Sequence, residues 1–184
     1  NIHIMEAIKC IKTRRSIRRF KENPVDHNTI NAIIDAAAMS PSWKNTQIAR
    51  YNIIESREIL DNIADNCVLD FEFNQKTIHR APQLCVVSMV TKRCGYERDG
   101  SFSTSKEDRW EMFDAGIASQ TFCLAAHDMG VGTVILGIFD EDKVAAAINL
   151  PDGQKVAALI VMGYPDQECE APKRKTVDEL VTYM

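Results

Sequence analysis

Residues 107–129, "EDRWEMFDAGIASQTFCLAAHDM", carry the longest helical pattern in the chain. Gly130 follows them, at a position where glycine often closes a helix because it tolerates a left-handed backbone. Apolar residues, Trp110 and Phe113 among them, occupy most of the circumference, which predicts a helix at the centre of the fold. Four small residues lie in its middle: Ala115, Gly116, Ala118 and Ser119. They would let another helix approach closely, either in an ordinary core or at a subunit interface.

Helices and strands alternate on both sides of this segment. The predicted helices cover residues 3–12, 27–40 and 141–150, and the predicted strands cover residues 51–55, 83–90, 132–139 and 155–164. Asp26 is placed to cap the second helix, and Pro41 ends it. Residues 94–106 are polar and contain Gly and Ser, so we expect a mobile loop that is a candidate lid. Residues 177–184 complete the alternating pattern, and periodicity alone does not give the order of the strands.

The composition favours one domain over residues 1–184 and narrows its partners. With 184 residues, 45% of them hydrophobic, the chain is long enough to bury one full core. Its net charge of −4 argues against a general nucleic-acid or membrane-surface binder, and no apolar run approaches the roughly 18 residues that span a bilayer. The six cysteines lack zinc-site spacing and follow no signal peptide, so we expect reduced thiols, no metal site and a cytoplasmic location.

A cluster of basic residues stands out in this acidic chain, at residues 13–21, "TRRSIRRFK". Arginine suits phosphate because its planar fork makes two charge-assisted hydrogen bonds to neighbouring oxygens. Arg14 and Arg18 lie four residues apart, and Ser16 adds a hydroxyl between them. A solvated basic helix end would explain the same residues, so both interpretations remain open. A second basic group, at residues 173–175, is remote in sequence and has the same two explanations.

Other segments point to a bound cofactor rather than to a protein nucleophile. Residues 40–47, "SPSWKNTQ", form a rigid turn whose polar groups could meet a ligand, although turn chemistry alone explains them. The glycines of "MGVGTVILG" close a helix and open a strand, whereas a dinucleotide fingerprint does the reverse. Gly137 would let a flat ring lie close to the backbone. No serine-hydrolase, zinc-protease or P-loop motif occurs, so we expect a cofactor to carry the chemistry.

Taken in order, these segments resemble the FMN-dependent nitroreductase family. The resemblance rests on "RRSIRRF", "SPSWKNTQ", "DAGIASQTFCLAAHDMGVGTVILGIF" and "MGYP" followed by "PKRKTVDELV", which together span nearly the whole chain. It implies an α+β fold in which helices wrap a mostly antiparallel central sheet. It also implies an intertwined homodimer with one FMN in each of two clefts at the subunit interface.

The resemblance assigns FMN contacts residue by residue. The phosphate and ribityl chain would meet Arg14, Arg15 and Ser16, with Arg174 and, beside it, Lys173. Arg18 would reach the pyrimidine edge, and Asn74 would hold the polar edge of the ring. The segment that one subunit lays against the flavin of the other corresponds to Pro41, Ser42, Trp43, Asn45 and Gln47. Leu136 and Gly137 would lie under the ring. The family often has Gln-Pro-Trp where this chain has Gln47-Ile48-Ala49, a change that we expect to alter packing behind the loop.

The implied reaction is ping-pong hydride transfer. NAD(P)H would reduce the flavin at N5 and leave, and a nitroaromatic, quinone or enone acceptor would then take its place. This scheme needs no side-chain acid or base, so we assign no catalytic residue. Two alternatives remain: another flavin reaction, such as dehalogenation, azoline oxidation or flavin consumption, and a non-enzymatic module that binds nucleic acid or an acidic protein. The net charge and the lack of aromatic residues among the arginines argue against the module.

Overall fold

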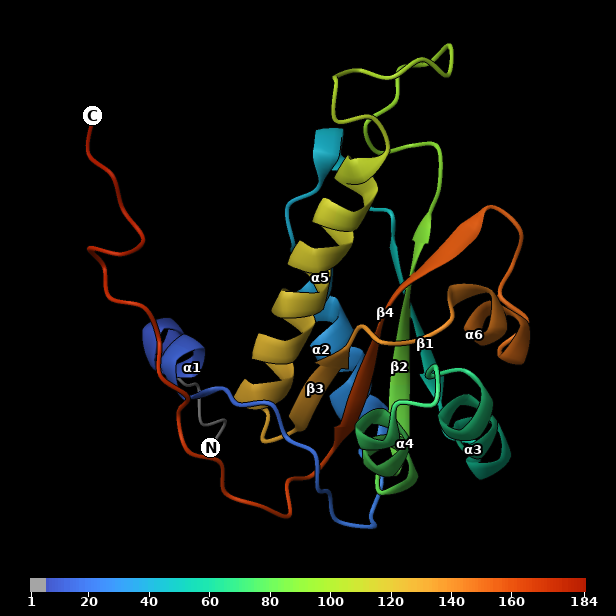
Figure 1. The fold of residues 1–184 in the computed structure, drawn as a ribbon, viewed down its shortest axis with the longest axis vertical. Coiled ribbons are helices and arrows are strands. Elements are labelled where there is room, and N and C mark those ends of the chain that lie inside the picture. The colour runs from blue at the N-terminus through green and yellow to red at the C-terminus, as the bar shows by residue number, and fades with distance from the viewer. Residues whose placement is uncertain (1–5) are drawn as a thin grey trace.

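A four-stranded antiparallel sheet forms the centre of the fold (Figure 1). The computed structural model describes residues 6–184. The strands are β1 (Ala49–Ile54), β2 (Gln83–Val90), β3 (Gly132–Leu136) and β4 (Gln154–Gly163), in the order β1-β2-β4-β3. The helices are α1 (Ala7–Thr13), α2 (His27–Ala38), α3 (Arg57–Asn66), α4 (Glu72–His79), α5 (Arg109–Asp128) and α6 (Glu141–Ala147), with a short 3-10 helix at Trp43–Asn45. The predicted α+β fold with a mostly antiparallel sheet is confirmed.

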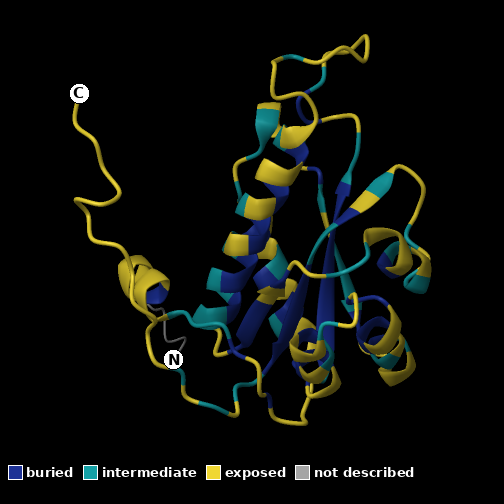
Figure 2. Cartoon of the chain, in the orientation of Figure 1, coloured by how far each residue is buried: buried dark blue, intermediate teal, exposed yellow. Residues whose placement is uncertain are grey.

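Both faces of the sheet are covered, which explains the apolar run in β2. Leu84 and Val86 of β2 face α3, α4 and α6, whereas Cys85 and Val87 face α2 and α5. Because successive side chains of a strand point to opposite faces, a strand covered on both faces must be apolar at nearly every position. Figure 2 shows β2 as a buried strand at the centre of the molecule. The prediction that residues 107–129 form a central helix is confirmed, because α5 packs against this sheet.

The capping predictions are confirmed by the backbone. Asp26 caps α2, because its carboxylate accepts the N–H of Thr29 at 3.0 Å. Gly130 closes α5 with a left-handed φ of 77°, and α2 stops before Pro41. No helix within residues 6–184 is long and apolar enough to cross a membrane.

Several element predictions need correction. The predicted strand 132–139 ends at Leu136, so Gly137 belongs to the following loop. Residues 177–184 form neither helix nor strand but the end of an exposed tail. Helices α3 and α4 were not predicted, although Ser56 caps α3 in the usual way and Leu60 and Ile63 bury its inner face. The first helix begins at Ala7, and the part of its predicted range before residue 6 lies outside the described residues.

The small residues of α5 serve mainly the core of the same chain. Ala115, Ala118 and Ser119 are buried within the chain, so only Gly116 is available to an approaching helix. The outer face of α5 instead carries large apolar side chains, Met112 and Phe113, which are 51% and 58% exposed. Of the two explanations for the four small residues, the ordinary core therefore accounts for three of them.

Candidate functional site

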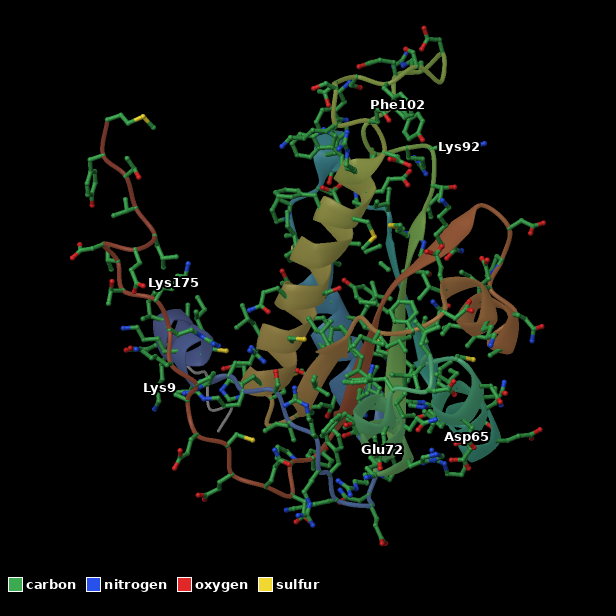
Figure 3. All side chains as sticks on the ribbon, in the orientation of Figure 1. Lys9, Asp65, Glu72, Lys92, Phe102 and Lys175 are labelled. Atoms are coloured by element: carbon green, nitrogen blue, oxygen red, sulfur yellow. The ribbon has the colours of Figure 1, made fainter. Side chains whose placement is uncertain are left out.

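The arginines of residues 14–18 converge with the C-terminal tail on one basic hollow. This hollow has a volume of about 540 Å³, and its lining residues are Arg14, Arg15, Ser16, Arg18, Cys169, Glu170, Pro172 and Arg174. Backbone pairing holds the arginine segment beside the sheet, because the N–H of Ile17 donates to the carbonyl of Thr133 in β3 at 2.9 Å. In Figure 3 the tail residue Lys175 lies on the same side of the molecule as Lys9 of α1. Lys173 is exposed and is not among the lining residues.

The positive charge in this hollow is not paired within residues 6–184, although Glu170 also lies in the lining. Within residues 6–184, none of its four arginines forms an ion pair with a carboxylate. Arg15 donates from Nη1 to the carbonyls of Lys12 and Arg14, while its buried Nε has no partner in this part of the chain. An unpartnered buried donor is costly, so a ligand with acceptor oxygens fits here. A phosphate group meets that description.

A histidine behind the hollow adds to its electrostatics. His127, at the end of α5, lies 2.9 Å from the hydroxyl of Thr13 through its Nε2 atom. Burial lowers the pKa of His127, and the positive charges of Arg14 and Arg15 lower it further. The sequence gives no sign that His127 lies beside the arginines, because this position depends on how α1 packs against α5.

The second group of predicted residues lies around a different pocket. Pro41, Ser42 and Gln47 line an apolar pocket of about 370 Å³ between α2, β1 and α5. Trp43 and Asn45 belong to the 3-10 helix that follows Ser42. The ring of Trp43 packs against Trp110 of α5, with centroids 4.9 Å apart. Ala49, which stands where the related family often has tryptophan, lines this pocket, so its small side chain adds space there.

The residues predicted to contact the flavin ring, Leu136, Gly137 and Asn74, lie near the end of β3. Leu136 is buried, whereas Gly137 is exposed, and a Cβ built on Gly137 would meet nothing within 4 Å. Asn74 of α4 supports this loop, because its Nδ2 donates to the carbonyl of Ile138 at 3.0 Å. The rise from Thr133 to Gly137 is about 13 Å along the strand. The basic hollow and the open surface at Gly137 are thus associated with the two ends of β3.

The structure places the arginines and the segment 41–47 of one chain near opposite ends of α5. The basic hollow adjoins the C-terminal end of α5 near His127, whereas the segment 41–47 contacts its N-terminal half at Trp110 and Asp114. From Asp114 to His127, α5 rises about 20 Å. Figure 1 shows the same separation, with α1 and the Trp43–Asn45 helix at opposite ends of α5. The arginines and the segment 41–47 of one chain are therefore separated by about 20 Å along α5.

Asp114 and Cys94, which lie near the segment 41–47, could not be recognised from the sequence. Asp114 accepts the backbone N–H of Trp43 at 2.8 Å and the thiol of Cys94 at 3.1 Å, both through Oδ2. All three residues come from segments that are far apart in the sequence. The available signal for Asp114 was weak: a carboxylate within a helix that is largely apolar.

Comparisons with known proteins identify the family of this chain. The model of the nitroreductase family matches residues 11–72 and 68–164. A nitroreductase family protein from Clostridium novyi is 31% identical, with a TM-score of 0.75 over 88% of this chain and 86% of that one. A Methanothermobacter thermautotrophicus protein, provisionally named NADH dehydrogenase/NAD(P)H nitroreductase, is 30% identical over 88% of this chain and 78% of its own length. FMN reductase [NAD(P)H] of Bacillus subtilis is 26% identical over 97% of this chain and 75% of its own length. The chain therefore belongs to the nitroreductase family.

Proposed function

We propose that this protein is an FMN-dependent NAD(P)H oxidoreductase that reduces small nitroaromatic, quinone or enone acceptors. The observation that carries the proposal is the hollow lined by four arginines, which form no ion pair within residues 6–184, beside a strand that ends at an open glycine surface. The first feature suits a phosphate and the second suits a flat ring. The names of the relatives, an NAD(P)H nitroreductase and an FMN reductase, support the same choice of cofactor and reductant.

We expect different residues to bind the phosphate, the pyrimidine edge and the face of the ring. Arg14 and Arg174, with Arg15 and Ser16, would hold the phosphate. Arg18 would place positive charge at the pyrimidine edge of the ring, where it favours negative charge that develops during reduction. Gly137 would let the ring lie against the backbone. When bound, FMN supplies the hydride-transfer chemistry, accepting hydride from NAD(P)H and passing it to a second small molecule.

The proposed cofactor site needs a second copy of the chain. The segment 41–47 lies about 20 Å along α5 from the arginines of its own chain, so in the proposed homodimer it meets the flavin bound by the partner. The exposed Met112 and Phe113 of α5 supply apolar surface for such an interface. The tail beyond residue 170 is exposed and carries Val177, Leu180 and Tyr183 away from the sheet (Figures 1 and 2). An intertwined dimer would bury these side chains.

The six cysteines are all free thiols, which is typical of a reducing compartment, and a cytoplasmic location is part of the proposal.

The test is to purify the protein, add FMN, and follow the flavin spectrum anaerobically. NADH or NADPH should bleach the bound flavin, and a nitroaromatic or quinone should restore it, with intact FMN recovered after release. Failure to bind FMN after reconstitution would reject the proposal and favour a non-enzymatic module. Loss of FMN during turnover would indicate flavin consumption. Halide release from a halogenated phenol, without reduction of the other acceptors, would indicate dehalogenation.

A further inference from the structure

Two buried carboxyl groups lie one turn apart at the start of α5. Glu111 is 4% exposed and Asp114 is 5% exposed. Each accepts hydrogen bonds from a loop rather than from a basic side chain. Glu111 accepts the backbone N–H of Lys92 at 2.6 Å. Asp114 accepts from Trp43 and Cys94, so it contacts two loops at once. Burying a carboxyl group is costly unless its hydrogen bonds are worth more than its hydration, so these contacts need an explanation.

The loop held through Trp43 has a strained backbone. Lys44, Asn45 and Gln47 have φ values of 45°, 55° and 49°, which are left-handed and uncommon for residues other than glycine. Strained backbone of this kind persists only when the surrounding contacts determine it. Some contacts are internal, such as the N–H of Gln47 donating to Oγ of Ser42 at 3.0 Å. These internal bonds shape the loop but do not fix its position on the protein.

Contacts with the rest of the protein fix that position. The hydrogen bond from the N–H of Trp43 to Asp114 connects the backbone of the 3-10 helix to α5. The stacking of Trp43 on Trp110 connects the side chain to the same helix. Lys44 forms an ion pair with Glu97 at 3.0 Å, but both groups are about half exposed, so solvent weakens it. Asp114 therefore provides the buried polar anchor of the segment 42–47.

The second donor to Asp114 comes from the candidate lid. Cys94 is fully buried and begins the loop 94–106, which contains Phe102, labelled in Figure 3. Burial, with the hydrogen bond and charge of Asp114, raises the pKa of Cys94 to about 12. The thiol therefore keeps its proton at physiological pH and can donate it to the carboxylate. One oxygen atom thus joins the segment 42–47 to the base of the loop.

We propose that Asp114 is a positioning residue that holds the FMN-contacting segment 42–47 and the loop 94–106 in one arrangement. The inference rests on the proposed function, because it takes that segment as part of the site for the flavin of the partner subunit. As a positioning residue, Asp114 does not itself touch the flavin. Its effect on the flavin passes through the backbone of Trp43, and its effect on the loop passes through Cys94.

The test compares FMN affinity and the visible circular dichroism of bound FMN across matched variants. Asp114→Ala should raise the FMN Kd about tenfold or more and alter the dichroism, since it removes a buried hydrogen bond that sets the loop position. Asp114→Asn should restore both, because the amide oxygen still accepts the N–H of Trp43. Glu111→Ala is the control: it removes a buried carboxyl from the same face of α5 and should leave FMN affinity near that of the parent.

A second pair of variants leaves Asp114 in place, in case Asp114→Ala does not fold. Trp43→Ala and Trp43→Pro both lose the indole ring, but only proline lacks the N–H. Proline is tolerated at the first position of a helix, so the backbone can accept it. The proline variant should bind FMN more weakly than the alanine variant. Equal affinities would overturn the role of this hydrogen bond.

Limited proteolysis tests the effect of Asp114 on the loop 94–106. Cys94→Ala should accelerate trypsin cleavage at Arg98 and Lys106 while leaving FMN affinity near that of the parent, and Cys94→Ser should be protected again. The inference is wrong if Glu111→Ala weakens FMN binding as much as Asp114→Ala, or if Asp114→Ala binds FMN like the parent. If the parent itself binds no FMN, the proposed function fails instead, and the trypsin result still reports on the loop.

Discussion

The basic hollow leads to a quantitative prediction about phosphate binding. Arg14 is half-buried at the end of α1, and Arg174 lies on the exposed tail, yet both line the same hollow. A hydrogen bond to a charged group contributes about 1.5 to 3 kcal/mol. Arg14→Ala and Arg174→Ala should therefore each raise the FMN Kd by roughly 10- to 150-fold. Arg14 should lie near the upper end, because solvent screens the exposed Arg174 more strongly.

The assay titrates the apoprotein with FMN and with riboflavin, following flavin fluorescence. Riboflavin lacks the phosphate, so the ratio of the two Kd values isolates the phosphate site. The parent should prefer FMN strongly, and both variants should lose much of that preference. The double variant should lose less than the sum of the single effects, since both arginines would contact one group. Arg19→Ala is the control, because Arg19 is exposed and lies outside the lining of the hollow.

An unchanged preference for FMN over riboflavin in both variants would refute the phosphate-binding role of these arginines. In that case the arginines serve another anion or none. A parallel loss of affinity for both ligands would also count against it, because the arginines would then support the fold rather than the phosphate.

Three further predictions follow from the same geometry. Gly137→Val should weaken FMN binding by about tenfold or more. It should not lower the thermal stability of the apoprotein, because the φ of Gly137 is not left-handed and a Cβ there meets nothing in the single chain. Unchanged FMN affinity would show that the ring does not lie on this surface. Burial and the neighbouring arginines lower the pKa of His127 in the folded state. As the pH falls below about 6.5, His127 is therefore protonated in the unfolded state before it is protonated in the folded state. The free energy of unfolding should therefore decrease over that window, and urea titrations should show a flatter pH dependence for His127→Gln. Light scattering should give about twice 20.7 kDa for the FMN-loaded protein. Phe113→Glu, at an exposed position of α5, should shift the mass toward one chain and weaken FMN binding, and an FMN-loaded parent of one-chain mass would contradict the dimer.

The sequence by itself determined the local structure around α5 and part of the chemistry. Apolar spacing predicted the central helix, the Asp26 and Gly130 caps depend on neighbouring residues only, and the apolar run of β2 indicated a strand covered on both faces. The arginine-rich segment was recognisable as a candidate anion site because its donors are adjacent along the chain. Even the missed helix α3 had readable signals, in Ser56 and in the spacing of Leu60 and Ile63.

Only the tertiary structure decided which of these groups meet. Arg14 and Arg174 stand far apart in the sequence, and they line one hollow because the tail returns past α1. The positioning role proposed for Asp114 depends on the tertiary structure, because Trp43 and Cys94 both donate hydrogen bonds to its Oδ2 atom. The division of the predicted site between the two ends of α5 depends on the length and placement of that helix. Local spacing reports on neighbours along the chain, whereas these contacts depend on how distant segments pack, and periodicity carries no information about that packing.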